Sequence, residues 1–141
     1  MKLLLLQGAN MEYLGRREPE FYGTTTARQL DALLRRRART LGVSLDIVYT
    51  NSEGEAVSAV YRAVRAGCDG ILFNPAGFLY AGHALRDCLT AVHVPALEIH
   101  MTNIEKRGRR SATAAAAIGV IAGFGIESYV LALEAMVTRL R

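Results

Sequence analysis

The run Met1-Lys2-Leu3-Leu4-Leu5-Leu6-Gln7 decides the fold class of this chain. Its four consecutive leucines do not alternate with polar residues. A strand with one face in water shows such alternation, whereas a strand of a parallel sheet covered on both faces reads as a continuous aliphatic run. We therefore expect residues 3–6 to lie inside a parallel sheet with helices on both sides.

Strand and helix patterns alternate along the rest of the chain. Apolar and β-branched runs predict further strands at residues 43–49, 69–73, 96–100 and 117–122. Apolar stripes at helical spacing predict helices at about 25–41, from 51 or 52 to 67, at 83–91 and at 126–140. Thr26 with Gln29 resembles a capping box at the first helix, which Gly42 ends. This order indicates an α/β fold with a parallel sheet.

Two local features add detail to this pattern. Pro75 follows the strand at residues 69–73 and disfavours helix for Asn74, so we expect a loop from there to about residue 82. The helix after residue 52 carries its larger apolar side chains on one side, namely Val57, Val60, Tyr61 and Val64. We expect that side to face the sheet.

Length and composition bound the organisation of the chain. Its 141 residues are 51% hydrophobic, which fits one domain spanning residues 1–141 with a sizeable core. The longest apolar runs are too short to span a bilayer, and the start lacks the pattern of a secretory signal. We expect a cytoplasmic protein that is not bound to a membrane.

Charge, cysteine and histidine patterns exclude several classes of function. The net charge of +4 could suggest nucleic acid, but the cluster at residues 35–39 lies on a predicted amphipathic helix without interleaved aromatic residues. It is read more simply as a solvated face. Cys68 and Cys88 form no paired motif, and the histidines lack the spacing of metal ligands. Neither a disulfide framework nor a metal site is predicted.

The loop at residues 15–23 contains a candidate base. It places Tyr22 close to Arg16 and Arg17, between the first strand and the first helix. A phenol ionises near pH ~10, and a neighbouring guanidinium favours the phenolate. Alternatively, Tyr22 only packs on the core and the arginines are solvated.

Other polar residues follow the predicted strands, where ligands bind in sheets of this class. Glu98 and His100 point to the same side of their strand, and the carboxylate favours a protonated imidazole that can act as an acid. A purely structural histidine is the alternative. Residues 102–105 have the form of a capping box, whose helix N-terminus could bind a carboxylate, although an ordinary capped turn has the same sequence.

Four motifs together identify a family resemblance. The segments REPEFYG (17–23), NPAG (74–77), EIHMTNI (98–104) and GVIAGFGIESY (119–129) are similar to those of type II 3-dehydroquinate dehydratases, almost from end to end. The resemblance implies a flavodoxin-like three-layer fold with a five-stranded parallel sheet in the order 2-1-3-4-5. It also implies trimers packed into a dodecamer, and a cofactor-free anti elimination of water through an enolate. The reaction converts 3-dehydroquinate to 3-dehydroshikimate in the shikimate pathway of aromatic amino acid biosynthesis.

The resemblance assigns roles in proton transfer by position. Tyr22 matches the base that removes the C2 proton, and Arg17 matches the residue that keeps it ionised. Asn10 matches the asparagine that helps to hold a water against the enolate. His100, oriented by Glu98, matches the acid that protonates the departing C1 hydroxyl.

It also assigns roles in substrate binding. Asn74 would hold the acid and the substrate in place, while Met101 and Thr102 would receive the substrate carboxylate. Asp87 matches an acidic residue that reaches into the site of a neighbouring subunit.

The sequence departs from the family pattern at the end of the site that binds the ring hydroxyls. Tyr80 replaces a usual histidine, within a loop that reads Phe78-Leu79-Tyr80-Ala81-Gly82. The segment after Asn103 is shorter than in the family, so the arginine that grips the ring hydroxyls is Arg109 or Arg110. Further departures are Gln7, Ala9 and Glu12.

Three functions fit these residues. The first is dehydration of 3-dehydroquinate, or of a close relative with a different ring-hydroxyl end. The second is a non-catalytic family member that binds a carboxylated ligand or a protein partner, although it would have no use for a matched base and acid. The third, a flavin or nucleotide carrier on the same fold, lacks a glycine-rich phosphate loop after the first strand.

Overall fold

A central parallel sheet organises the computed structural model, which describes all 141 residues. Its strands lie in the order β2-β1-β3-β4-β5, which confirms the order implied by the family resemblance. Their bounds are β1 Lys2–Ala9, β2 Ser44–Tyr49, β3 Gly70–Ala76, β4 Ala96–His100 and β5 Gly119–Ala122. Every neighbouring pair is parallel.

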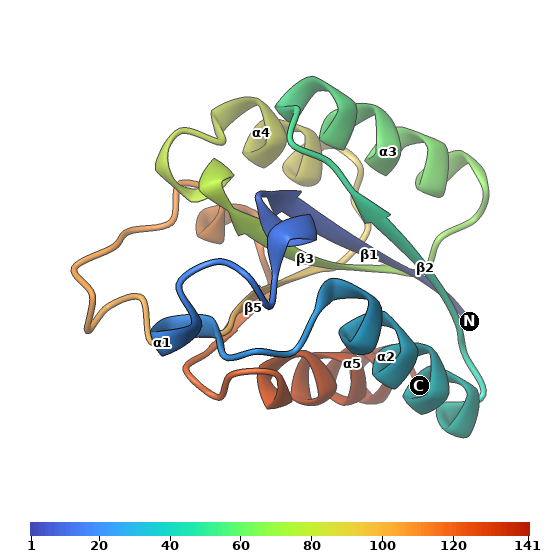
Figure 1. Cartoon of the computed structure of the whole chain (residues 1–141). Coiled ribbons are helices and arrows are strands. Elements are labelled where there is room, and N and C mark those ends of the chain that lie inside the picture. Colours follow the sequence, from blue (N-terminus) through green and yellow to red (C-terminus); the bar gives the residue numbers. More distant parts are fainter.

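Helices cover both faces of this sheet, as Figure 1 shows. On one face lie α2 Ala27–Leu41 and α5 Glu127–Leu140, and on the other α3 Glu53–Arg65 and α4 His83–Ala91. The short helix α1 Pro19–Tyr22 lies off the sheet, in the connection after β1. Side chains of α2 and α5 form one buried cluster with Leu3 and Leu5 of β1. Side chains of α3 and α4 form a second cluster with Leu4 and Leu6. The leucine run therefore supplies both cores at once, because successive strand residues point to opposite faces.

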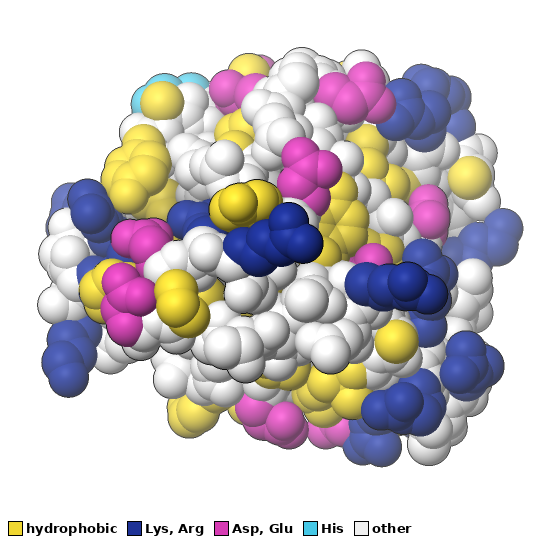
Figure 2. Space-filling view, in the orientation of Figure 1, with side chains coloured by type: hydrophobic (Ala, Val, Ile, Leu, Met, Phe, Trp, Pro, Cys, Tyr) yellow, Lys and Arg dark blue, Asp and Glu magenta, His cyan; other side chains and the backbone are white.

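The first long helix begins and ends at the residues that the sequence indicates. The Thr26 hydroxyl accepts a hydrogen bond from the Gln29 backbone, and the Gln29 side chain accepts one from the Thr26 backbone. The helix ends at Gly42, whose φ of 70° is readily adopted by glycine. The basic cluster on α2 is not only solvated, because Arg37 pairs with Glu134 of α5. Figure 2 shows several basic side chains on the part of the surface where α2 lies, with neutral ones between them.

Two predictions about secondary structure were wrong in detail. Strand β3 continues through Pro75 to Ala76, where it pairs only with β1, since its register with β4 stops at Phe73. Proline is tolerated where a strand lacks one neighbour. Tyr61 is 42% exposed and does not face the sheet, because the smaller Ala56 and Ala59 occupy the buried stripe of α3.

The long connection after β1 is more ordered than an open loop. A 3₁₀ turn at Met11–Tyr13 and the short helix α1 form within it, and Pro19 is the first residue of that helix. Proline suits this position because its missing N–H would have no helical partner there. Tyr22 is the last residue of α1, so this helix carries it to the carboxyl end of the sheet. No helix in the structure has the length and apolar character needed to cross a membrane.

Candidate active site

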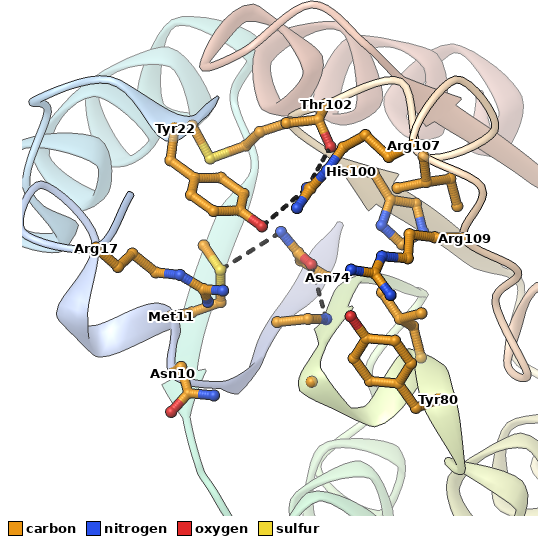
Figure 3. A pocket seen from close by; sticks show the side chains of 15 residues that line it. Asn10, Met11, Arg17, Tyr22, Asn74, Tyr80, His100, Thr102, Arg107 and Arg109 are labelled. Atoms are coloured by element: carbon orange, nitrogen blue, oxygen red, sulfur yellow. Dashed lines mark hydrogen bonds between the residues drawn. The ribbon is translucent and has the colours of Figure 1, made fainter. Parts of the chain in front are cut away.

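A cavity of about 120 Å³ lies beyond the carboxyl ends of β1, β3 and β4. This is where parallel α/β sheets place their ligands. Figure 3 shows its lining side chains converging from segments far apart in the sequence. They are Asn10, Met11, Arg17, Tyr22, Asn74, Ala76, Gly77, Leu79, Tyr80, His100, Met101, Thr102, Ile104, Arg107 and Arg109.

His100 and Glu98 form a buried pair at the end of β4. Nε2 of His100 lies 2.5 Å from Oε1 of Glu98, and the two side chains are 4% and 0% exposed. The hydroxyl of Thr113 donates to the second carboxylate oxygen at 2.7 Å. Glu98 is thus held from both sides, and it holds one nitrogen of the imidazole. His100 lines the cavity and Glu98 does not, and their contact fits the expectation that both side chains point to the same side of β4.

Tyr22 is contacted by two guanidinium groups. The guanidinium carbon of Arg17 lies 4.5 Å from the centre of the Tyr22 ring. Nη1 of Arg107 donates to the Tyr22 hydroxyl at 3.1 Å and to the Thr102 hydroxyl at the same distance. The hydrogen bond to Tyr22 raises the pKa of Arg107, and Arg107 also stacks on the ring of Phe21. The contact to the Tyr22 hydroxyl therefore comes from Arg107, a residue that the sequence motifs did not indicate.

Asn74 is buried in the floor of the cavity, at 5% exposure. Its Oδ1 accepts from the backbone N–H of Ala76 at 2.9 Å, and its Nδ2 donates to the hydroxyl of Tyr129 at 2.7 Å. Asn10 lines another side of the cavity, directly after β1. Its φ of 73° is left-handed, a conformation that asparagine tolerates better than most residues.

Tyr80 and Arg109 lie together at the opposite rim. The guanidinium carbon of Arg109 lies 5.5 Å from the centre of the Tyr80 ring, and Tyr80 is 61% exposed. Arg110 instead lines a separate hollow near β5. Of the two arginines that the sequence left open, Arg109 is the one at the cavity.

Two other expected features lie elsewhere or take another form. Asp87 is exposed on α4 and does not line the cavity of its own chain. Residues 102–105 do not begin a helix, so of the two readings that the sequence left open the structure shows the capped turn and not the helix N-terminus. The chain makes a turn in which Asn103 Oδ1 accepts from the backbone of Lys106, and the Thr102 hydroxyl binds Arg107.

No group of three or more His, Cys, Asp or Glu side chains gathers where it could hold a metal ion.

Sequence comparison assigns the chain to a known family. Residues 1–137 match the family model described as dehydroquinase class II. The chain belongs to the class II dehydroquinase family.

Relatives in this family cover nearly the whole chain. The 3-dehydroquinate dehydratase of Edwardsiella ictaluri is 46% identical over 141 residues, which span 98% of this chain and 94% of that protein. The 3-dehydroquinate dehydratase of Geotalea daltonii is 42% identical over 145 residues, which span 100% of this chain and 99% of that protein. A crystal structure of the type II dehydroquinase from Propionibacterium acnes superposes with a TM-score of 0.91 at 35% identity, covering 97% of this chain and 96% of that one.

Three residues that contact the candidate site of this dehydroquinase-family chain were not predicted from the sequence. Arg107 lies in a polar segment with three other cationic residues, and its spacing did not mark it out. Thr113 and Tyr129 follow patterns of ordinary loop and helix residues, respectively. Each is recognised only by what it touches, namely Tyr22, Glu98 and Asn74.

Proposed function

We propose that the protein is a hydro-lyase that eliminates water from 3-dehydroquinate to give 3-dehydroshikimate. Its membership of the dehydroquinase family supports this activity, and so do the names of its relatives. The observation that carries the proposal is that a phenol bonded to a guanidinium and an imidazole bonded to a carboxylate line one cavity. An elimination needs such a base and such an acid together. Nothing in the cavity favours the non-catalytic alternative.

Tyr22 acts as the base in this proposal. Its oxygen, as a phenolate, takes the proton from C2 of the substrate, and the electrons of that bond delocalise into the adjacent ketone as an enolate. The hydrogen bond from the Arg107 guanidinium joins two charged groups when Tyr22 is ionised, which makes it shorter and stronger. Arg17 adds a second cation over the ring. Asn10 helps to hold a water against the enolate oxygen.

His100 acts as the acid. The enolate electrons return to form the double bond between C1 and C2, and the C1 hydroxyl leaves as water with a proton from the imidazole. Glu98 holds the imidazole that this step needs, and Thr113 keeps Glu98 in place. Both proton transfers use side chains that line or directly support the cavity.

The charges of the cavity suit a substrate with a carboxylate. Three arginines line it, at positions 17, 107 and 109, and no Asp or Glu does so. Met101 and Thr102 receive the carboxylate in our proposal, beside the guanidinium of Arg107. Arg109 and Tyr80 lie at the other rim and face the ring hydroxyls. Asn74 binds between these two ends.

The decisive experiment is a direct assay. Mixing the purified protein with 3-dehydroquinate should produce the ultraviolet absorbance of the conjugated enone. Tyr22→Phe is the matched control, because it removes one oxygen and leaves the ring that packs against Arg17. It should nearly abolish turnover and still bind substrate. A wild-type protein that binds 3-dehydroquinate without forming product would contradict the proposal.

We further propose that residues 1–141 act as one dehydroquinase domain that assembles into trimers and then a dodecamer. Asp87 supports this proposal, because it is exposed on α4 while its family role lies in a neighbouring subunit's site. The apolar side chains of Ile118, Val120 and Phe124 are also exposed along and after the edge strand β5. Burying such a patch between subunits would be favourable. The cytoplasmic location stays a prediction.

A further inference from the structure

A buried chain of polar side chains runs beneath the cavity floor. Tyr129 of α5 is 1% exposed, and its hydroxyl reaches the ends of β1 and β3. It donates to Oε1 of Gln7 at 2.8 Å and accepts from Nδ2 of Asn74 at 2.7 Å. Only Asn74 among these three lines the cavity. The other two therefore reach a ligand only through Asn74.

The contacts of Asn74 determine which group donates in each hydrogen bond between Asn74, Tyr129 and Gln7. Oδ1 of Asn74 accepts from the backbone N–H of Ala76, so the other end of the amide, Nδ2, is the end at Tyr129. An amide nitrogen only donates, so the Tyr129 oxygen has to accept from it. The proton of Tyr129 is then free for Gln7. Burial raises the pKa of Tyr129, which keeps that proton in place.

The amide of Asn74 consequently presents a donor to the cavity. One Nδ2 hydrogen is used by Tyr129, and the second lies near Sδ of Met11, at an N to S distance of 3.7 Å. A thioether is a weak acceptor, so this hydrogen is poorly satisfied by the protein. Figure 3 shows the Asn74 nitrogen pointing toward Met11 across the cavity floor. A ligand oxygen there would be a better partner than sulfur.

The protein keeps this arrangement although it leaves another group unpaired. Nε2 of Gln7 is the one buried side-chain nitrogen or oxygen without a hydrogen-bond partner. An unpaired buried donor is unfavourable, and an aliphatic side chain would avoid it at this 0% exposed position. A side chain needed only to fill the core has no reason to carry this amide. Its Oε1, however, is the acceptor that fixes the Tyr129 proton.

We propose that Tyr129 is a positioning residue: held by Gln7, it fixes the Asn74 amide together with the backbone N–H of Ala76, so that an N–H donor faces the cavity. The site then selects substrates that present an acceptor oxygen, such as a hydroxyl or a carboxylate, above Asn74. If the amide oxygen of Asn74 faced the cavity instead, the site would select a ligand that presents a hydrogen-bond donor. Tyr129 touches neither substrate nor reacting atoms and acts only through Asn74. The activity readouts below rest on the proposed dehydratase function.

A double-mutant cycle tests whether Tyr129 works through Asn74. Tyr129→Phe should lower kcat/KM about tenfold, the effect of losing one hydrogen bond. In an Asn74→Ala background the same change should have no further effect, because the amide that Tyr129 directs is gone. Tyr61→Phe is the control, since this exposed tyrosine of α3 lies outside the chain of Gln7, Tyr129 and Asn74. It should leave kcat/KM unchanged. A tenfold loss in both backgrounds would overturn the proposal.

A second variant separates positioning from stability. Tyr129→Phe leaves Oε1 of Gln7 unpaired, so it should also lower the melting temperature. Adding Gln7→Leu removes that buried polar group and should recover part of the lost stability. If Tyr129 positions Asn74, kcat/KM stays low in the double variant. If Tyr129 has only a structural role, activity returns together with stability, and the proposal fails.

The third readout needs neither catalysis nor a folded variant. The two Asn74 side-chain amide hydrogens of the wild-type protein can be followed by NMR hydrogen exchange. The hydrogen bonded to Tyr129 should exchange slowly, and the one facing the cavity should exchange much faster. Two equally fast hydrogens would overturn the proposal. If wild-type protein fails to turn over 3-dehydroquinate but shows this asymmetry, the proposed function fails and the positioning role of Tyr129 stands.

Discussion

Arg107 and Arg17 contact different parts of Tyr22. Arg107 donates to the oxygen, whereas Arg17 lies over the ring face. A charge stabilises the phenolate most strongly when it bonds the charged atom itself. The family resemblance drew attention to Arg17 alone, but the hydrogen bond to the Tyr22 oxygen comes from Arg107, so we expect Arg107 to have the larger effect on the proposed base.

Replacing Arg107 should therefore impair turnover strongly. Arg107→Met should lower kcat about ten- to a hundredfold, the effect of losing a hydrogen bond to a charged group. Arg110→Met is the matched control, because Arg110 lines a different hollow and should affect kcat little. Steady-state kinetics with 3-dehydroquinate measure both. If Arg17→Met reduces kcat more than Arg107→Met does, the oxygen contact is not the decisive one.

Tyr80 should act on substrate recognition through Arg109. Its exposed ring contacts the Arg109 guanidinium, and an exposed cation–π contact is worth about 0.5–1 kcal/mol. Tyr80→Leu should therefore raise KM about two- to fivefold with little change in kcat. Tyr80→Phe keeps the ring and is the control for the lost hydroxyl. Equal effects of the two changes would show that the hydroxyl matters and the ring does not.

The neighbouring Gly82 limits how this rim can be changed. Tyr80→His introduces the histidine that the family resemblance implies at this rim, and Gly82→Ser would add a second hydrogen-bond donor. A Cβ at Gly82, however, would lie 2.6 Å from the carbonyl oxygen of Phe78 and 2.9 Å from Cγ2 of Thr113. The first contact is with backbone and cannot relax easily. We expect Gly82→Ser to lower the melting temperature and to disturb Thr113, which bonds Glu98, while Tyr80→His alone folds normally.

At the level of the elements, α2 offers a clean test of local stability. Thr26→Ala removes the hydroxyl half of the capping box and should lower the free energy of unfolding by about 1 kcal/mol. Thr24→Ala, just outside the helix, should change it little. Urea denaturation with unchanged m-values measures both. Equal stability of the two variants would mean that helix packing alone sets the start of α2.

The order and type of the elements could be predicted because hydrophobic periodicity determines them. The leucine run, the capping box at Thr26 and the strand at residues 96–100 each follow from local sequence. Pro75 was misjudged because its tolerance depends on where β4 ends, which is a tertiary fact. Tertiary contacts also explain why only part of the site could be predicted. The family motifs contain Tyr22, whereas the turn that brings Arg107 to Tyr22 depends on contacts across the fold.

At the scale of the whole molecule, the position of Asp87 bears on assembly, because this residue does not line the cavity of its own chain. It lies on the exposed side of α4, so a family-like role requires a second subunit. We expect light scattering to give a mass that is a multiple of three chains of 15.4 kDa. A monomer at working concentrations would remove the proposed assembly and any function of Asp87 in a neighbouring site.

Mixing two inactive variants tests the shared site directly. Tyr22→Phe lacks the proposed base, and Asp87→Asn lacks the carboxylate that the proposed assembly places in the neighbouring site, so we expect each homogeneous oligomer to have low activity. In oligomers reassembled from equal amounts, about a quarter of the sites combine an intact Tyr22 with an intact Asp87 from the next chain. Activity should therefore recover to about that fraction of wild type. Mixing Tyr22→Phe with Asn74→Ala is the control, because both changes affect the same chain's cavity and no intact site can form. Recovery in the control, or none in the test mixture, would show that Asp87 does not act across a subunit boundary.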